Sequence, residues 1–88
     1  MTKTSVVILN WNGVDYLKKF LPSLISYTSI PDVELVVADN ASSDSSLEFL
    51  ESEYPNIHVI KLDKNYGFAG GYNKALEHLT ADYFMVLN

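Results

Sequence analysis

The chain has 88 residues, of which 48% are hydrophobic and 19% charged, and its formal net charge is -5. This is ordinary globular composition, and the length allows at most one domain. The negative charge argues against a nucleic-acid partner, and the lack of cysteine excludes disulfide bonds and thiolate metal sites.

Four short apolar segments read as β-strands. They are rich in Val and Ile and nearly continuous rather than alternating, and they span residues 5–9, 33–38, 57–62 and 83–87. Strands that are covered on both faces have this pattern. We therefore expect four buried strands.

The first intervening segment has helical spacing. Its apolar stripe consists of Leu17, Phe20, Leu21, Leu24 and Ile25. Pro22 lies inside it, so we expect this helix to be kinked or shortened there.

The second and third helices are marked by a start signal and by an apolar face. Ser45 with Glu48 predicts a capping box for the second helix, and Ser43 and Asp44 are competing caps. The apolar face of the third helix is expected to consist of Tyr72, Ala75, Leu76 and Leu79.

This alternation of strands and helices predicts an α/β fold. We expect a parallel sheet of about four strands in the order 3-2-1-4, with helices on both faces. Ligands of such sheets bind outside the carboxyl ends of the strands, where the strand order reverses. The polar and glycine-rich stretches NWNG, DNASSD and DKNYGFAGG follow the strands and fall at this edge, as does Asn88.

Asp39 ends an apolar strand, where a carboxylate is costly unless hydrogen bonds satisfy it. In one interpretation it holds the DNASSD turn or caps the second helix. In the other it accepts a hydrogen bond from a ligand. The imide N–H of uracil would suit a carboxylate, in contrast to cytosine, and so would the ribose hydroxyl of an adenosine.

The stretch after the first strand lacks the GxGxxG of dinucleotide enzymes. Asn12 and Gly13 are explained by a turn before the first helix. Trp11 is interpreted as core filler, with a base-stacking platform as the alternative.

The stretch NYGFAGGYN concentrates three glycines at the start of the third helix. Any one of them is explained by close packing of the helix on the sheet. Gly67, Gly70 and Gly71 together, flanked by Asn65 and Asn73, favour backbone amides exposed to a polar or anionic ligand. The lysine and the Ser or Thr of a P-loop are missing.

Four blocks, VVILNWNGVDYLKKFLPSL, ELVVADNASSDSSLEFL, NYGFAGGYNKAL and DYFMVLN, resemble in order and spacing the N-terminal half of family 2 glycosyltransferases. The likeness is strongest to the rhamnosyltransferase-like branch that acts in bacterial polysaccharide assembly. The resemblance implies a Rossmann-like GT-A fold and an inverting transfer, assisted by Mg²⁺ or Mn²⁺. The implied donor is a UDP- or dTDP-linked sugar, and the implied acceptor a glycan or a lipid-linked molecule.

The resemblance also assigns residues to nucleotide binding: Asn10, Trp11, Asn12, Asp39, Asn65, Gly67, Gly71 and Asn73. It implies that the first three contact the nucleoside and that Asp39 binds the base. The segment from Asn65 to Asn73 would line the nucleotide pocket.

Family members carry a DxD-like metal-binding motif and the general base beyond the position of Asn88. We therefore expect no catalytic residue and no metal ligand within residues 1–88. The chain is expected to be the donor-nucleotide-binding part of an incomplete GT-A domain, inactive alone. A fourth strand left as an apolar edge would promote self-association.

Two other classes of function remain open. One is a non-catalytic interaction or regulatory fragment, and the less favoured one is a Rossmann NAD-binding module. No apolar run approaches the roughly 20 residues of a membrane span, and residues 6–9 are too few for a signal-peptide core. We expect a cytoplasmic protein, with peripheral association of a longer form at the cytoplasmic face of a membrane as a possible addition.

Overall fold

The computed structural model describes residues 3–87 and contains seven elements in strict alternation. In chain order they are β1 Thr4–Asn10, α1 Val14–Thr28, β2 Val33–Asp39, α2 Ser46–Glu53, β3 His58–Lys61, α3 Gly67–Glu77 and β4 Tyr83–Leu87. The strands form one parallel sheet in the order β3-β2-β1-β4. This confirms the predicted α/β fold and strand order, while Asn88 lies outside the described residues.

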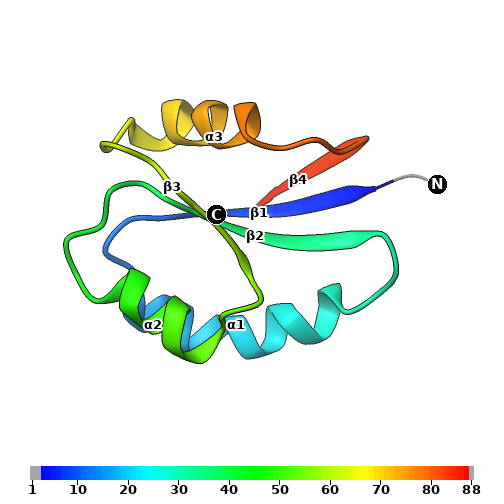
Figure 1. The fold of residues 1–88 in the computed structure, drawn as a ribbon, viewed down its shortest axis with the longest axis horizontal. Helices are drawn as coiled ribbons and strands as arrows, with labels where there is room; N and C mark the ends of the chain where they lie inside the picture. The colour runs from blue at the N-terminus through cyan, green and yellow to red at the C-terminus, as the bar shows by residue number, and fades with distance from the viewer. Residues whose placement is uncertain (1–2, 88) are drawn as a thin grey trace.

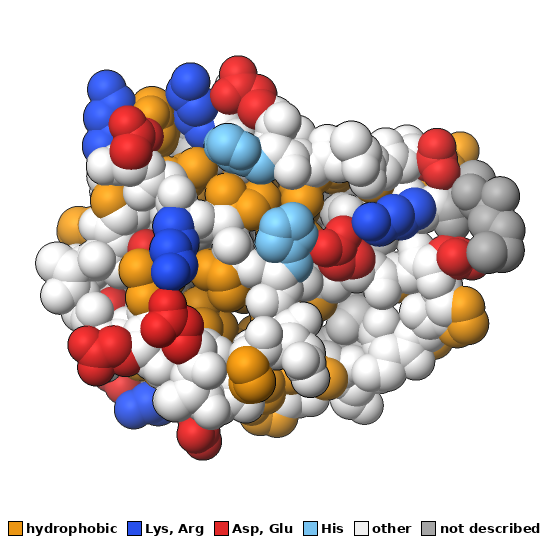
Figure 2. Space-filling view, in the orientation of Figure 1, with side chains coloured by type: hydrophobic (Ala, Val, Ile, Leu, Met, Phe, Trp, Pro, Cys, Tyr) orange, Lys and Arg blue, Asp and Glu red, His pale blue; other side chains and the backbone are white. Residues whose placement is uncertain are grey.

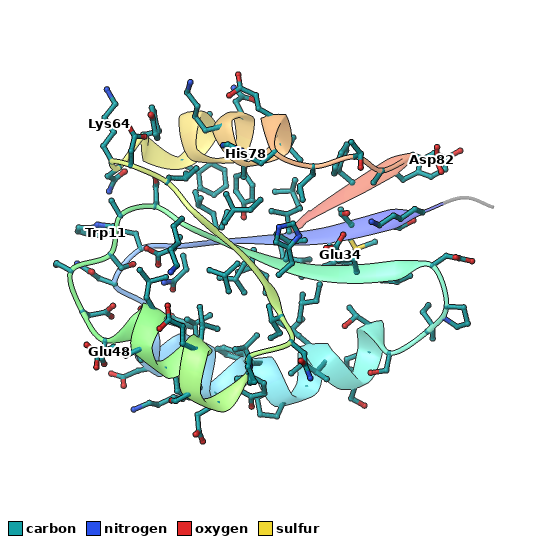
Figure 3. The ribbon with its side chains drawn as sticks, viewed as in Figure 1. Trp11, Glu34, Glu48, Lys64, His78 and Asp82 are labelled. Carbon is teal, nitrogen blue, oxygen red and sulfur yellow. The ribbon has the colours of Figure 1, made fainter. Side chains whose placement is uncertain are left out.

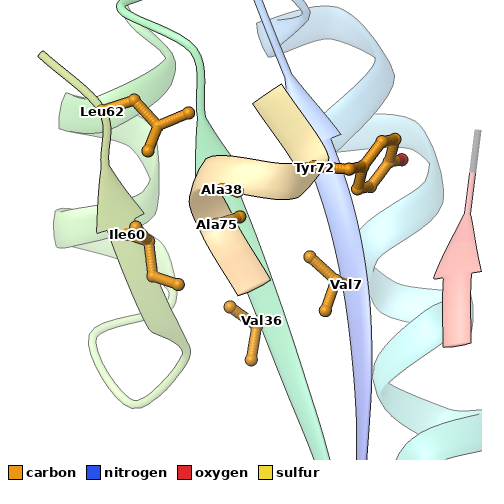
Figure 4. Close-up of a cluster of buried hydrophobic side chains, with 7 residues drawn as sticks. All are labelled: Val7, Val36, Ala38, Ile60, Leu62, Tyr72 and Ala75. Carbon is orange, nitrogen blue, oxygen red and sulfur yellow. The ribbon is translucent and has the colours of Figure 1, made fainter. Parts of the chain in front are cut away.

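Helices cover both faces of the sheet, as Figure 1 shows, with α3 on one face and α1 and α2 on the other. The α3 face holds the larger buried cluster (Figure 4), which consists of Val7, Val36, Ala38, Ile60, Leu62, Tyr72 and Ala75. The opposite face holds Leu17, Leu21, Val37 and Leu50. Successive side chains of a strand point to opposite faces, so Val36 and Val37 serve different clusters.

The strand register brings the carboxyl ends of the strands together. Asn10 pairs with Asp39, and Asp39 pairs with Lys61 on its other side. The loops after β1, β2 and β3 therefore gather at one edge, on the left of Figure 1. We call this the carboxyl edge: the three loops spanning residues 10–13, 39–45 and 62–67.

The expectation of four covered strands is correct for β1 and β2 and wrong for β4. Four of its five residues are exposed: Tyr83, Phe84, Met85 and Val86. Among residues 3–87, β4 has a neighbouring strand only on its β1 side, and no layer of helices covers its faces. Pro22 does not shorten α1, which continues for six residues beyond it.

The predicted capping box is also wrong in detail. Ser45 precedes α2 but its side chain makes no capping hydrogen bond. Oδ1 of Asp44 accepts hydrogen bonds from the Ser46 N–H at 2.9 Å and from the Ser46 hydroxyl. Asp44, which the sequence offered as a competing cap, therefore caps α2 in place of Ser45. A carboxylate near a helix N-terminus is also favoured by the helix dipole.

The surface carries mixed charge. Lysine and acidic side chains are interspersed over the face seen in Figure 2, which gives that face no field of a single sign. Within the part of the chain that the structure describes, no helix is long and apolar enough to cross a membrane.

Candidate functional site

Asp39 is the centre of the carboxyl edge. The residue is 1% exposed, and its Oδ1 accepts hydrogen bonds from Asn10 Nδ2 at 2.9 Å and from the Ser42 hydroxyl at 2.7 Å. Its Oδ2 accepts one from the Ser42 N–H at 2.9 Å. An ionised carboxylate has about four acceptor positions, so these three donors leave Oδ2 with capacity for one more. Asp39 thus holds the turn and retains one acceptor position.

Asn12 joins the loop after β1 to the loop after β2. Its Oδ1 accepts hydrogen bonds from the N–H groups of Ser43 at 2.7 Å and Asp44 at 3.1 Å. Its own N–H donates to the Ser42 hydroxyl oxygen at 2.9 Å. Asn12 has a φ of 49°, in the left-handed region that asparagine tolerates better than most residues.

Asp44 ties α1 to the same loops. Its Oδ2 accepts a hydrogen bond from the Val14 N–H at 3.2 Å, in addition to the Ser46 bonds at Oδ1. Desolvation would raise the pKa of this carboxyl, but hydrogen bonds from Ser46 and Val14 outweigh it and hold the pKa below 3.8.

Asn40 connects the loop after β2 to the start of α3. Its side-chain oxygen accepts from the Tyr66 N–H at 2.9 Å, and its Nδ2 donates to Asn65 Oδ1 at 3.0 Å and to the Gly67 carbonyl at 3.1 Å. Asn65 Oδ1 also accepts from the Gly67 N–H at 2.7 Å. Within this edge, Asp39 and Asn40 therefore bind different loops, although they are neighbours in the chain.

Gly71 and Gly67 occupy their positions for different physical reasons. A Cβ at Gly71 would lie 2.8 and 2.9 Å from the methyl groups of Leu9 and 3.0 Å from Asn40 Nδ2, so close packing requires glycine there. Gly67 has a φ of 75°, and a Cβ on it would meet no atom within 4 Å. The space beside the first turn of α3 is open, which a ligand approaching its backbone amides requires.

Trp11 is 55% exposed, so its interpretation as core filler is wrong. Figure 3 places Trp11 and Lys64 at the carboxyl edge, far from Glu34 and Asp82. A groove of about 670 Å³ begins at Asn10, Trp11 and Leu87, where the strand order reverses between β1 and β4, and continues along α1.

Asn73 stands apart from the other predicted residues. It lies on an exposed side of α3, and no hydrogen bond within residues 3–87 links it to the rest of the site. The structure adds two residues that the sequence did not single out, Asn40 and Ser42. Their signal in the sequence is weak, because small polar residues after a strand usually mark only a turn.

Acidic groups at the carboxyl edge are already engaged within the protein. The Tyr66 hydroxyl donates to Asp63, which lowers the pKa of the carboxyl and raises that of the phenol. Among residues 3–87, no group of three or more His, Asp or Glu side chains is placed to hold a metal ion.

The family model for glycosyl transferase family 2 matches residues 5–88. A putative teichuronic acid biosynthesis glycosyltransferase of Bacillus subtilis is 32% identical over 87 residues, which cover 96% of this chain and 34% of that protein. An N-acetylglucosaminyl-diphospho-decaprenol L-rhamnosyltransferase of Mycobacterium tuberculosis is 30% identical over 74 residues, covering 84% of this chain and 24% of that protein.

A solved structure shares the fold. The crystal structure of S. aureus TarS 1-349 in complex with UDP-GlcNAc has a TM-score of 0.80 and 28% identity, covering 97% of this chain and 26% of that one. The chain spans between 13% and 34% of the length of the curated relatives it matches.

Proposed function

Since the chain belongs to glycosyl transferase family 2, we propose that residues 1–88 are the N-terminal nucleotide-binding part of a larger GT-A domain. The whole enzyme would transfer a sugar from a UDP- or dTDP-linked donor to a glycan or lipid-linked acceptor in polysaccharide assembly, with inversion at the sugar. These 88 residues would bind the donor nucleotide.

The observation that carries the proposal is the interlocking of three loops around Asp39 and Asn40. Asn10 and Asn12 come from the first loop, Ser42 from the second, and Asn65 from the third. All of them lie at or beyond the carboxyl ends of parallel strands, near the point where the strand order reverses. This is the position that binds nucleotides in open α/β sheets.

Base recognition would fall to Asp39. A carboxylate accepts hydrogen bonds only, so its remaining position on Oδ2 suits the imide N–H of uracil or thymine. Cytosine has an acceptor nitrogen at that place and would face the carboxylate unfavourably. Exposed Trp11 would supply an aromatic surface for the base, since bases stack favourably on aromatic side chains.

The start of α3 would receive the diphosphate. Backbone N–H groups at a helix N-terminus and the helix dipole favour anions, and the space beside Gly67 is open. The family resemblance implies Mg²⁺ or Mn²⁺ on the diphosphate, and it places the metal-binding motif beyond the position of Asn88. Among residues 3–87, no three or more His, Asp or Glu side chains are grouped so that they could hold a metal ion by themselves. The resemblance also places the general base beyond Asn88, so we propose nucleotide binding, and no step of the transfer, for residues 1–88.

The test is a titration of the ¹⁵N-labelled chain with UDP, dTDP, CDP and NAD. We expect amide shifts at residues 10–13, 39–45 and 65–71 with UDP and dTDP, weaker binding of CDP, and none of NAD. Asp39→Asn should abolish the preference for UDP over CDP. Asp63→Asn is the matched control, because Asp63 lies at the same edge but is exposed and accepts its side-chain hydrogen bond from Tyr66, not from the loops that Asp39 joins.

Three results would contradict the proposal. Stronger binding of NAD would favour the Rossmann module, and a dispersed spectrum without shifts for any nucleotide would favour an interaction fragment. An equal UDP preference in the Asp39→Asn and Asp63→Asn variants would remove Asp39 from base recognition.

The predicted cytoplasmic location, with peripheral membrane association of a longer form, remains a prediction that fractionation of cells would test.

A further inference from the structure

Asn40 is buried at the carboxyl edge, with 2% of its surface exposed. Its main chain is fixed by a hydrogen bond from its N–H to the Asn10 carbonyl at 2.8 Å. The Asp39 carbonyl beside it accepts from the Leu62 N–H at 2.9 Å. The backbone at residues 39 and 40 is therefore held between the loops that follow β1 and β3.

The side chain of Asn40 makes a set of contacts that suits a carboxamide. Its Oδ1 accepts a hydrogen bond from the Tyr66 N–H, and its Nδ2 donates to Asn65 Oδ1 and to the Gly67 carbonyl. A carboxylate at this position would place an acceptor against two acceptors, and an alanine would leave all three partners without Asn40. These contacts span residues 65–67, which lead directly into α3.

Adjacent residues thus serve two ends of the candidate site. Asp39 holds the loops that contain Asn10 and Ser42, and Asn40 holds the loop that sets the first turn of α3. The Cα atoms of neighbouring residues are about 3.8 Å apart, so the spacing between the two ends is fixed by one peptide unit.

We propose that Asn40 is a positioning residue that fixes the first turn of α3 relative to Asp39, so that the base and the diphosphate of one nucleotide are bound together. The inference rests on the proposed function, because it assigns the two ends of the same nucleotide. In this proposal Asn40 itself contacts neither the base nor the diphosphate, because its side chain is hydrogen-bonded to residues 65–67. Its effect is to place the backbone amides that follow Gly67 in the first turn of α3 where the diphosphate of a nucleotide held at Asp39 would lie; the N–H groups of Tyr66 and Gly67 themselves donate to Asn40 and Asn65.

The test compares UDP with uridine in the wild type and in Asn40→Ala, by titration of the ¹⁵N-labelled chain. Uridine lacks the diphosphate, so the ratio of the two affinities reports on the start of α3 alone. We expect Asn40→Ala to reduce the ratio of the UDP affinity to the uridine affinity about tenfold. A tenfold change corresponds to the net contribution of one to two hydrogen bonds. Asn56→Ala, an exposed asparagine between α2 and β3, is the control and should keep the wild-type ratio.

Asn40→Asp decides the case if Asn40→Ala does not fold. A protonated carboxyl can donate one hydrogen bond and accept another, so it imitates the carboxamide in part. Burial and the two neighbouring acceptor oxygens would raise the pKa of a carboxyl at this position above its ordinary value of about 3.9. The UDP to uridine ratio of this variant, relative to the wild type at the same pH, should therefore rise as the pH falls from 7.5 to 5. A structural role alone would weaken UDP and uridine in parallel and leave the ratio unchanged.

The two possible failures are distinguishable. If the wild type binds neither UDP nor dTDP, the proposed function falls, and the role of Asn40 falls with it. If the wild type binds UDP and a folded Asn40→Ala variant keeps the wild-type ratio, only the role of Asn40 is overturned. A ratio for Asn40→Asp that does not respond to pH beyond the wild type would overturn it as well.

Discussion

Gly71 shows how closely α3 packs on the sheet. Alanine there would bring a methyl group within 3.0 Å of Leu9 and to 3.0 Å from Asn40. Overpacking of this kind typically costs about 1–3 kcal/mol, of which the better helix propensity of alanine returns about 1 kcal/mol. We expect Gly71→Ala to lower the free energy of unfolding by about 1 kcal/mol net in urea melts.

Gly70→Ala is the matched control for this prediction. The same methyl group at Gly70 would have Tyr66 Cβ at 3.2 Å as its nearest neighbour outside the helix backbone. The helix propensity gain is the same at both positions, so the difference between the two variants compares three contacts at or below 3.0 Å at residue 71 with one contact at 3.2 Å at residue 70. Equal stability of the two variants would show that the contact with Leu9 and Asn40 does not restrict residue 71.

The sequence allowed us to predict several of the residues that lie at the candidate site, but not which contacts each of them makes. Asp39, Asn10 and Asn12 were expected at this edge, and the structure brings them together through Ser42 and the loop after β2. The part played by Asn40 was not predictable, because its partners at residues 65–67 are 25 to 27 positions away in the chain. Their contact depends on β2 and β3 being neighbours in the sheet.

The start of α2 depends on one carboxylate. Asp44 accepts the hydrogen bond from Ser46, whereas the Ser45 side chain makes no capping bond. Loss of a helix cap costs about 1 kcal/mol, so we expect Asp44→Ala to destabilise the fold by about that amount. Ser45→Ala should leave the urea midpoint nearly unchanged. A larger loss with Ser45→Ala than with Asp44→Ala would restore the capping box predicted from the sequence.

The same carboxylate makes α2 sensitive to acid. Hydrogen bonds to the charged form hold the pKa of Asp44 below 3.8 in the folded protein despite the opposing desolvation. A lowered folded pKa contributes stability above pH 3.8 that is lost as the pH falls through the folded value. We expect the stability difference between the wild type and Asp44→Asn to shrink below that pH, measured by thermal melts. A difference that stays constant down to pH 2.5 would contradict this.

At the scale of the whole molecule, the order of strands and helices was predictable from the sequence alone. Right-handed crossovers and the alternation of strand and helix leave few topologies, and 3-2-1-4 is the one observed. The exposure of the faces of β4 was not predictable from its composition, whereas the apolar edge expected of this strand is present among residues 3–87. Its apolar run resembles that of β2, but β2 has strands on both sides whereas β4 has only β1 among residues 3–87.

The edge of β4 leads to a prediction about association. Edge strands are commonly protected by charges, prolines or bulges, and the sequence YFMVL has no charged residue and no proline. An identical strand from a second copy could therefore pair with it without opposing like charges. We expect the average mass of the 88-residue chain to rise with concentration in light scattering, through pairing of two β4 edges.

Met85 is the residue with which to test this pairing. It is the middle residue of β4 and is 54% exposed, so a lysine there reaches solvent in the monomer but places two like charges near each other in a paired edge. Met85→Lys should hold the mass at that of the monomer. Ile30→Lys is the control, because Ile30 is 58% exposed but lies in the loop before β2, which β1 separates from β4 in the sheet. A wild type that is monomeric at millimolar concentration would contradict the prediction, and so would an equal effect of the two lysines, because charge alone would then govern the association.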